Sequence, residues 1–136
     1  MGRPFVRSCP APGSALQREP VDKIRIHDLE VFYRVGVTEQ ERSKPQRLLL
    51  CLELEHDFGS AVARDNLAET VDYHAVCRRL LAFGEGSDWQ LIETLASDIA
   101  RLILEEFGPR SVAVEVKKFV IPQAASVSVW LQRQAK

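Results

Sequence analysis

The spacing of apolar residues changes twice along the chain, and the order of these changes limits the folds open to it. Apolar residues alternate with polar ones, as in half-buried strands, over 23–35, 47–58, 111–119 and 125–133. They recur three and four residues apart, as in amphipathic helices, over 73–81 and 91–103. The sequence therefore predicts an α+β fold in the order strand, strand, helix, helix, strand, strand, with an irregularity in the first strand at His27-Asp28.

This order leaves surfaces that a single chain does not cover. Two helices can cover only one face of a four-stranded sheet, and the sheet has two edges that must be covered or paired. The last strand also carries a polar face, formed by Ser126, Ser128 and Gln132. Joining sheets edge to edge would pair the edges and enclose a polar lumen, so we expect the chain to form rings.

The composition excludes several classes of protein. A chain of 136 residues is long enough for one domain with its own core. Its 18 Lys and Arg nearly balance its 19 Asp and Glu, which argues against a nucleic-acid partner. No apolar stretch reaches the roughly 20 residues of a membrane span. The three cysteines have no metal-ligand spacing, so the sequence predicts reduced thiols, a cytoplasmic location and no metal site.

The first 21 residues differ from the rest of the chain. They contain four of the seven prolines and show neither the strand period nor the helix period. We therefore expect a flexible tail over 1–21, followed by one domain over 22–136.

Two candidate functional residues lie near the start of a helix or in a loop. Glu41 belongs to the polar loop 36–46, and long loops of compact domains often carry function. Tyr73 begins the first predicted helix, for which Thr70 is a possible cap. Taken alone, each is also typical of an ordinary solvated carboxylate or a core tyrosine.

Two further candidates lie beside apolar faces. Glu93 borders the apolar stripe of the second helix and shares its own face with the small residues Ala96 and Ala100, so we expect room there for a flat ligand with paired N–H groups. Lys118 continues the apolar face of the third strand, where desolvation would favour the neutral amine and suit it to proton transfer. Lys117 points to the opposite face and is expected to be solvated.

In combination, these residues resemble the motifs of the dihydroneopterin aldolase family. The similar segments are, in order, Gly36-Val37 with Glu41 and Gln46, Asp65 with Thr70-Val71-Asp72-Tyr73, Leu91-Ile92-Glu93 with Leu95-Ala96, and Lys118 at the end of the third strand. The resemblance extends from about Asp22 to Arg133, which is almost everything outside the tail.

The resemblance implies the tunnelling fold, a four-stranded antiparallel sheet with two helices on one face (ββααββ). It implies homo-oligomeric rings, as tetramers or octamers, with active sites between subunits. The implied reaction is a lyase step of folate biosynthesis without metal or cofactor, the cleavage of 7,8-dihydroneopterin into 6-hydroxymethyl-7,8-dihydropterin and glycolaldehyde. By motif position, Lys118 would be the proton donor and acceptor, and a neighbouring subunit's Tyr73 would protonate the intermediate or hold the side-chain hydroxyls. The catalytic residue Glu41 would bind the substrate's hydroxylated tail and help set the charge state of Lys118. The pterin would be held by Glu93 and the Ile92 backbone.

Two alternatives remain open at the level of sequence. An epimerase of the same family would share the bond cleavage and rejoin the fragments, and one specific for a triphosphate would need basic residues near the tail, such as Arg42, Lys44 and Arg47. A non-catalytic ring protein would keep only pterin binding. Phe119 follows Lys118 where many family members have proline, so we expect the turn and the tail contacts to differ.

Overall fold

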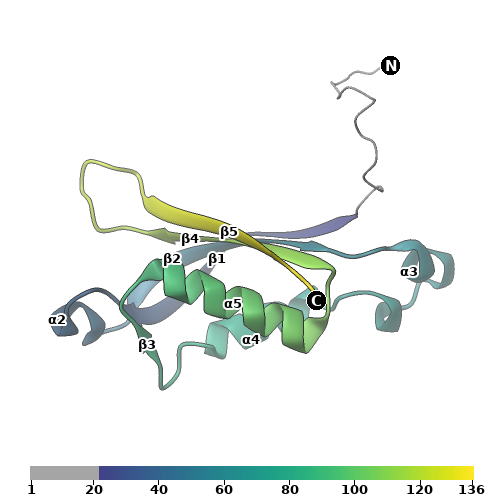
Figure 1. Cartoon of the computed structure of the whole chain (residues 1–136), viewed down its shortest axis with the longest axis horizontal. Coiled ribbons are helices and arrows are strands. Elements are labelled where there is room, and N and C mark those ends of the chain that lie inside the picture. The colour runs from purple at the N-terminus through teal and green to yellow at the C-terminus, as the bar shows by residue number, and fades with distance from the viewer. Residues whose placement is uncertain (1–21) are drawn as a thin grey trace, which may run out of the picture.

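The computed structural model describes residues 22–136, which form one sheet with helices on one of its faces (Figure 1). The strands are β1 (Lys23–Val35), β2 (Gln46–Glu55), β3 (Asp88–Trp89), β4 (Ser111–Lys118) and β5 (Val127–Gln134). The helical elements are α2 (Glu39–Arg42), α3 (Gly59–Arg64), the 3-10 turn η1 (Leu67–Glu69), α4 (Tyr73–Ala82) and α5 (Ile92–Phe107). The predicted flexible tail, 1–21, lies outside the described residues.

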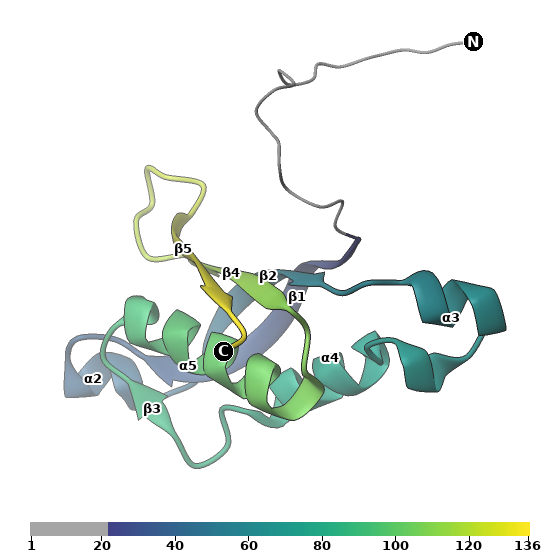
Figure 2. The same cartoon turned by 45° about the vertical axis from the view of Figure 1, so that its right-hand side comes forward.

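The sheet has the strand order β3-β1-β2-β4-β5. The pairs β1–β2, β2–β4 and β4–β5 are antiparallel, whereas β3 runs parallel to β1. Helices α4 and α5 lie side by side on the same face of the sheet in both views (Figures 1 and 2). The predicted order of four long strands and two long helices is confirmed, and β3 is an additional short strand that the apolar spacing did not reveal.

The core lies between the sheet and these two helices. Leu48, Leu50 and Leu54 are fully buried, as the alternation in 47–58 predicts for one face of β2. The apolar stripe of α5 is buried against them through residues such as Leu95, Ile99 and Ile103. These contacts orient α5, so the position of its first turn depends on packing of the whole helix against the sheet.

Tyr33 ties β1 to the helical layer. Its side chain is 1% exposed, and its hydroxyl donates a 2.6 Å hydrogen bond to the carbonyl of Leu80 in α4. Burial raises the pKa of the Tyr33 phenol, so the group is a neutral donor. Its ring lies 5.6 Å, centroid to centroid, from that of Trp89 in β3. This one side chain therefore joins α4, β1 and β3.

The predicted irregularity in β1 is a bulge. The register with β2 shifts between Ile26 and Leu29, and Asp28 adopts a left-handed backbone with φ of 52°. The extra residue lets both Ile26 and Val31 face the helices, although one position is even and the other odd. The bulge also turns the Asp28 carboxylate to the open face of the sheet, where it meets Lys117 at 2.8 Å.

Two local expectations are corrected by the structure. Thr70 does not cap α4, because Asp72 accepts hydrogen bonds from the backbone N–H groups of His74 and Ala75. The segment 36–46 is not an open loop, since it contains α2.

No helix within residues 22–136 is long and apolar enough to cross a membrane.

Candidate functional site

Lys118 ends β4 on the helix-covered face of the sheet. It is paired in register with the buried Leu48 of β2, and its side chain is 12% exposed. This is the orientation that the alternation of β4 predicts. Lys117 points to the opposite face, as expected, and its side chain is the more exposed of the two at 27%. Its amine also forms an ion pair with Asp28, and that hydrogen bond raises its pKa. Of the two lysines, only Lys118 faces α2.

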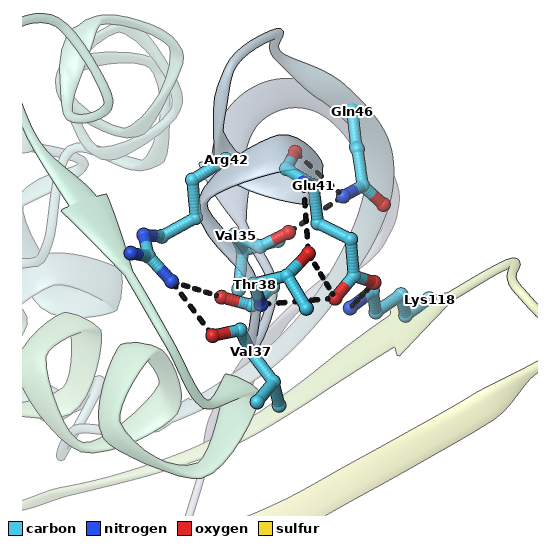
Figure 3. Close-up of polar contacts among 8 residues, drawn as sticks. Val35, Val37, Thr38, Glu41, Arg42, Gln46 and Lys118 are labelled. Atoms are coloured by element: carbon cyan, nitrogen blue, oxygen red, sulfur yellow. Dashed lines mark hydrogen bonds and ion pairs between the residues drawn. The ribbon is translucent and has the colours of Figure 1, made fainter.

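Glu41 is the charged group that faces Lys118. Its carboxylate Oε2 lies 3.7 Å from Lys118 Nζ, as Figure 3 shows. This separation is longer than a normal hydrogen bond, so the two groups form a loose ion pair. The two residues are far apart in sequence and are brought together because β2 places the end of β4 beside the end of β1, from which α2 begins.

The other oxygen of the Glu41 carboxylate is held by Thr38. The Thr38 backbone N–H lies 3.3 Å from Glu41 Oε1, and the Thr38 hydroxyl accepts from the Glu41 backbone N–H at 3.1 Å, which together form a capping box. The hydrogen bond from the Thr38 backbone is the main cause that lowers the pKa of Glu41, and the nearby Lys118 charge acts in the same direction. Glu41 is therefore an ionised carboxylate with one oxygen fixed and one facing Lys118.

Three side chains fix α2 to the end of β1. Arg42 donates to the carbonyl oxygens of Gly36 and Val37 at 2.8 and 2.9 Å, and Gln46 donates to the carbonyl of Val35. Arg34 donates to the carbonyl of Arg42 from the β1 side. These contacts connect the backbone before α2 and at its end to neighbouring side chains, and they support a helix that is too short to be stable alone.

Gly36 allows Glu41 to pack against the chain at this point. A Cβ on Gly36 would overlap the Cβ of Glu41 and would come within 2.8 Å of its Cδ. Because the Glu41 Cβ is attached to the α2 backbone, rotation of the side chain alone cannot relieve this overlap. The glycine is therefore required by the close approach of α2 to the end of β1.

The first turn of α5 lies at the same end of the sheet. β3 pairs with Val35 at the end of β1, and α5 begins at Ile92 shortly after it (Figure 1). Glu93 is exposed and Ile92 is buried. The N-cap residue Leu91 has no side-chain acceptor and makes no cap hydrogen bond to the first turn of α5. The space expected beside Glu93 is not lined by Ala96, which is fully buried in the core.

Tyr73 lies at the opposite end of the sheet. It begins α4, is 60% exposed, and lines a surface pocket with Ile24 and Phe58. Ile24 is paired with Leu54 of β2, whereas Lys118 is paired with Leu48. The structure thus brings Glu41, Lys118 and the start of α5 to one end of a subunit and places Tyr73 at the other.

The residues that the sequence reasoning missed are those that hold Glu41. Thr38 and Glu41 have the spacing of a capping box, a local pattern that could have revealed this contact. The contacts of Arg34 and Arg42 with backbone carbonyls have no comparable sequence signal. Among residues 22–136, no group of three or more His, Cys, Asp or Glu could hold a metal ion.

Comparisons with known proteins show the family to which the chain belongs. A family model described as dihydroneopterin aldolase matches residues 24–132. The dihydroneopterin aldolase of Streptomyces coelicolor is 36% identical over 98 residues, which cover 72% of this chain and 82% of that protein. A crystal structure from Vibrio cholerae superposes with a TM-score of 0.80 at 32% identity and covers 85% of this chain and 99% of that chain.

A second solved structure is the dihydroneopterin aldolase of Escherichia coli in complex with neopterin. It superposes with a TM-score of 0.77 at 26% identity, over 82% of this chain and 98% of that chain. The tunnelling fold expected from the resemblance is confirmed, with β3 as a fifth strand. The chain belongs to the dihydroneopterin aldolase family.

Proposed function

We propose that this protein is a dihydroneopterin aldolase that cleaves 7,8-dihydroneopterin into 6-hydroxymethyl-7,8-dihydropterin and glycolaldehyde. The observation that carries the proposal is the pairing of Lys118 with Glu41 at 3.7 Å, in a chain of this family. The family is one of aldolases, which are lyases that break a carbon–carbon bond. The product supplies the pterin of folate biosynthesis.

The substrate explains why acid–base side chains suffice. A retro-aldol cleavage needs a place for the electrons of the broken bond, and the dihydropterin ring has an imine next to the side chain. When a base removes the proton of the tail hydroxyl beside the bond, the bond breaks and its electrons move into this imine. The pterin-side carbon is then protonated. The protein therefore has to hold the ring and move two protons.

Lys118 is the group proposed to move these protons. Its side chain is 12% exposed and lies on the same face of β4 as fully buried residues such as Val116. Little water can therefore reach its amine. Glu41 offers a carboxylate oxygen 3.7 Å away. That distance leaves the amine free of a direct hydrogen bond and lets a substrate hydroxyl or a water contact both groups.

The first turn of α5 is proposed to hold the pterin ring. Glu93 can accept two parallel N–H bonds from the amino and ring N–H groups of a pterin. The backbone N–H groups after Leu91, beginning with that of Ile92, can donate to a ring acceptor. Glu93 lies on the exposed side of this turn, where a ligand can reach its carboxylate.

Tyr73 can join this site only from a neighbouring subunit. Leu48, beside Lys118, and Leu54, beside Ile24 and the Tyr73 pocket, are six residues apart in β2, which corresponds to about 20 Å along the strand. A tyrosine side chain cannot span that distance. A ring of four subunits, single or stacked as an octamer, would bring a second Tyr73 to Lys118.

The sheet edges are compatible with such a ring. Within residues 22–136, β5 has no strand partner on its outer edge, and β1 has only β3 beside Arg34 and Val35. Long unpaired edges invite pairing with another chain. Cys51 and Cys77 are free thiols, which fits the proposed cytoplasmic location.

The two arginines of the 36–47 segment are already bound to other groups of the protein, which favours an unphosphorylated substrate over a triphosphate. Arg42 is engaged by backbone carbonyls, and Arg47 is paired with Glu30 at 2.6 Å while its guanidinium lies 5.0 Å from the Phe119 ring centroid. Lys44 is exposed. An epimerase acting on the unphosphorylated compound remains the alternative, because it would use the same cleavage step.

The test is to incubate purified protein with 7,8-dihydroneopterin in EDTA and to separate the products by chromatography. Release of 6-hydroxymethyl-7,8-dihydropterin and glycolaldehyde supports the aldolase. Conversion only to an epimer would move the assignment to the epimerase. Binding of neopterin without any product would instead indicate a non-catalytic pterin-binding ring.

The neighbouring lysines provide a matched pair of variants. Lys118→Ala is expected to lower kcat by about 10²–10⁴-fold, the usual contribution of a general acid–base group, and to retain neopterin binding. Lys117→Ala is expected to keep the wild-type kcat, because that amine lies on the opposite face with Asp28. Equal turnover in wild type and Lys118→Ala would show that the proposed mechanism is wrong.

A further inference from the structure

Thr38 makes more contacts with Glu41 than a helix cap alone requires. Its hydroxyl accepts from the Glu41 backbone N–H at 3.1 Å and lies 3.4 Å from Glu41 Oε1. Its backbone N–H lies 3.3 Å from the same Oε1. A hydroxyl can accept one hydrogen bond and donate another at once, so all three contacts can form together. They converge on one oxygen of the carboxylate and leave the other, Oε2, facing Lys118 (Figure 3).

The length of the Glu41–Lys118 contact fits a carboxylate held in place from behind. An unrestrained carboxylate beside a half-buried ammonium group would be expected to close to a direct hydrogen bond of about 2.8 Å. Here the separation is 3.7 Å, and the carboxylate is retained on the Thr38 side by two donors.

We propose that Thr38 is a positioning residue of the active site, which holds the Glu41 carboxylate at a fixed distance from Lys118 so that one substrate hydroxyl can contact both groups. The inference rests on the proposed function, since it assigns a role within that same site. It goes beyond the proposed function because it attributes the separation of Glu41 and Lys118 to Thr38. Without the Thr38 hydroxyl, only the Thr38 backbone N–H would still hold Oε1, so the carboxylate would be less firmly fixed relative to the amine.

The charged groups around Glu41 leave Lys118 as its main ionic partner. From α2 itself, the Arg42 guanidinium is directed to the carbonyls of Gly36 and Val37. From β1, Arg34 is directed to the carbonyls of Arg42 and Ser43. From β2, the group next to Glu41 is the uncharged Gln46 amide. Loss of the Thr38 hydroxyl would leave the backbone contacts of Thr38 and Val37, together with the Lys118 charge, to lower the pKa of Glu41, so this pKa is expected to rise toward its ordinary value.

The test compares three variants of the full chain. Thr38→Val keeps the shape and removes the hydroxyl, whereas Thr38→Ser keeps the hydroxyl. Ser43→Ala is the matched control, because Ser43 Oγ donates to the Gln40 carbonyl at the other end of α2 and has no contact with Glu41. We would measure kcat and its pH profile, and follow the Glu41 carboxyl carbon by NMR during a pH titration. Thermal melts would show that each variant is folded.

Thr38→Val is expected to lower kcat about tenfold, which corresponds to about 1.4 kcal/mol, and to move the acidic limb of the profile and the Glu41 titration to higher pH. Thr38→Ser and Ser43→Ala are expected to behave as wild type. An unchanged Thr38→Val enzyme, or an equal loss in Ser43→Ala, would overturn the inference. So would a wild-type Glu41 that titrates at or above the ordinary value for glutamate, and this last measurement requires no variant to fold.

The outcomes also separate this inference from the proposed function. If the wild-type protein does not cleave 7,8-dihydroneopterin, the proposed function fails. The NMR titration still decides whether Thr38 holds Glu41, because it needs no turnover. If the wild type is active and the Thr38→Val titration is unchanged, only the positioning role of Thr38 fails.

Discussion

Replacing Gly36 with alanine is expected to impair the active site while leaving the domain folded. The added Cβ would overlap the Glu41 Cβ and would stand 3.0 Å from its Cγ and 2.8 Å from its Cδ. Carbon atoms in good contact lie about 3.5–4.0 Å apart, so α2 has to move by roughly 1 Å. The movement cannot be confined to the end of the side chain, because the closest atom is attached to the α2 backbone.

The two consequences of this shift differ in size. Overpacking of this kind costs about 1–3 kcal/mol, which a domain with a net stability of about 5–15 kcal/mol can tolerate. A misplacement of about 1 Å in a catalytic group can lower a rate by about 10²-fold. Because Glu41 has only a loose contact with Lys118 in the first place, we expect kcat to fall by about this factor.

The assay is steady-state cleavage of 7,8-dihydroneopterin, with a thermal melt of the same sample. Gly86→Ala serves as the control. Gly86 has a φ of 76°, so an alanine there strains the backbone, but the added Cβ would have no atom within 4 Å and would not contact Glu41. We expect this control to lose stability and keep its kcat. A Gly36→Ala enzyme with wild-type kcat would refute the reasoning, since it would show that the position of α2 does not set the rate.

Two further predictions concern stability. Tyr33→Phe removes a buried hydroxyl that donates to the Leu80 carbonyl, and this carbonyl still accepts from the Phe83 N–H. We therefore expect the free energy of unfolding to fall by about 1 kcal/mol and the Tm to fall by about 4 °C. An unchanged Tm would mean that this hydrogen bond makes no net contribution to stability. The hydrogen bond from Lys117 holds the pKa of Asp28 below its ordinary value of 3.8, so the pair stabilises the fold above that pH and the contribution is lost as pH falls through the lowered pKa. The Tm difference between wild type and Asp28→Asn should therefore be constant above about pH 5 and shrink below about pH 4, and a difference that does not depend on pH would contradict the assigned ion pair.

The long elements of the fold could be predicted because each one carries its own repeating pattern. The alternation around Leu50 in β2 and the helical spacing around Ile99 in α5 report which side of each element is buried. The same alternation placed Lys118 on the buried side of β4. These conclusions depend only on neighbouring residues along the chain, which is why they needed no tertiary structure.

The short elements could not be predicted in this way. β3 has only two residues, Asp88 and Trp89, which is too few to show any period, and it exists because it pairs with the end of β1. Thr70 and Asp72 are both residue types suited to an N-cap, and the structure shows that Asp72 is the cap. In each case the local sequence permits more than one structure.

The sequence by itself determined the strands, the long helices and the residues that could carry chemistry, because periodicity and residue type are local properties. Only the tertiary structure decided which of these residues meet. Strand register places Glu41 3.7 Å from Lys118, and the same register separates Tyr73 from Lys118 by the length of β2. These distances depend on pairing between segments far apart in the chain, and no local pattern encodes them.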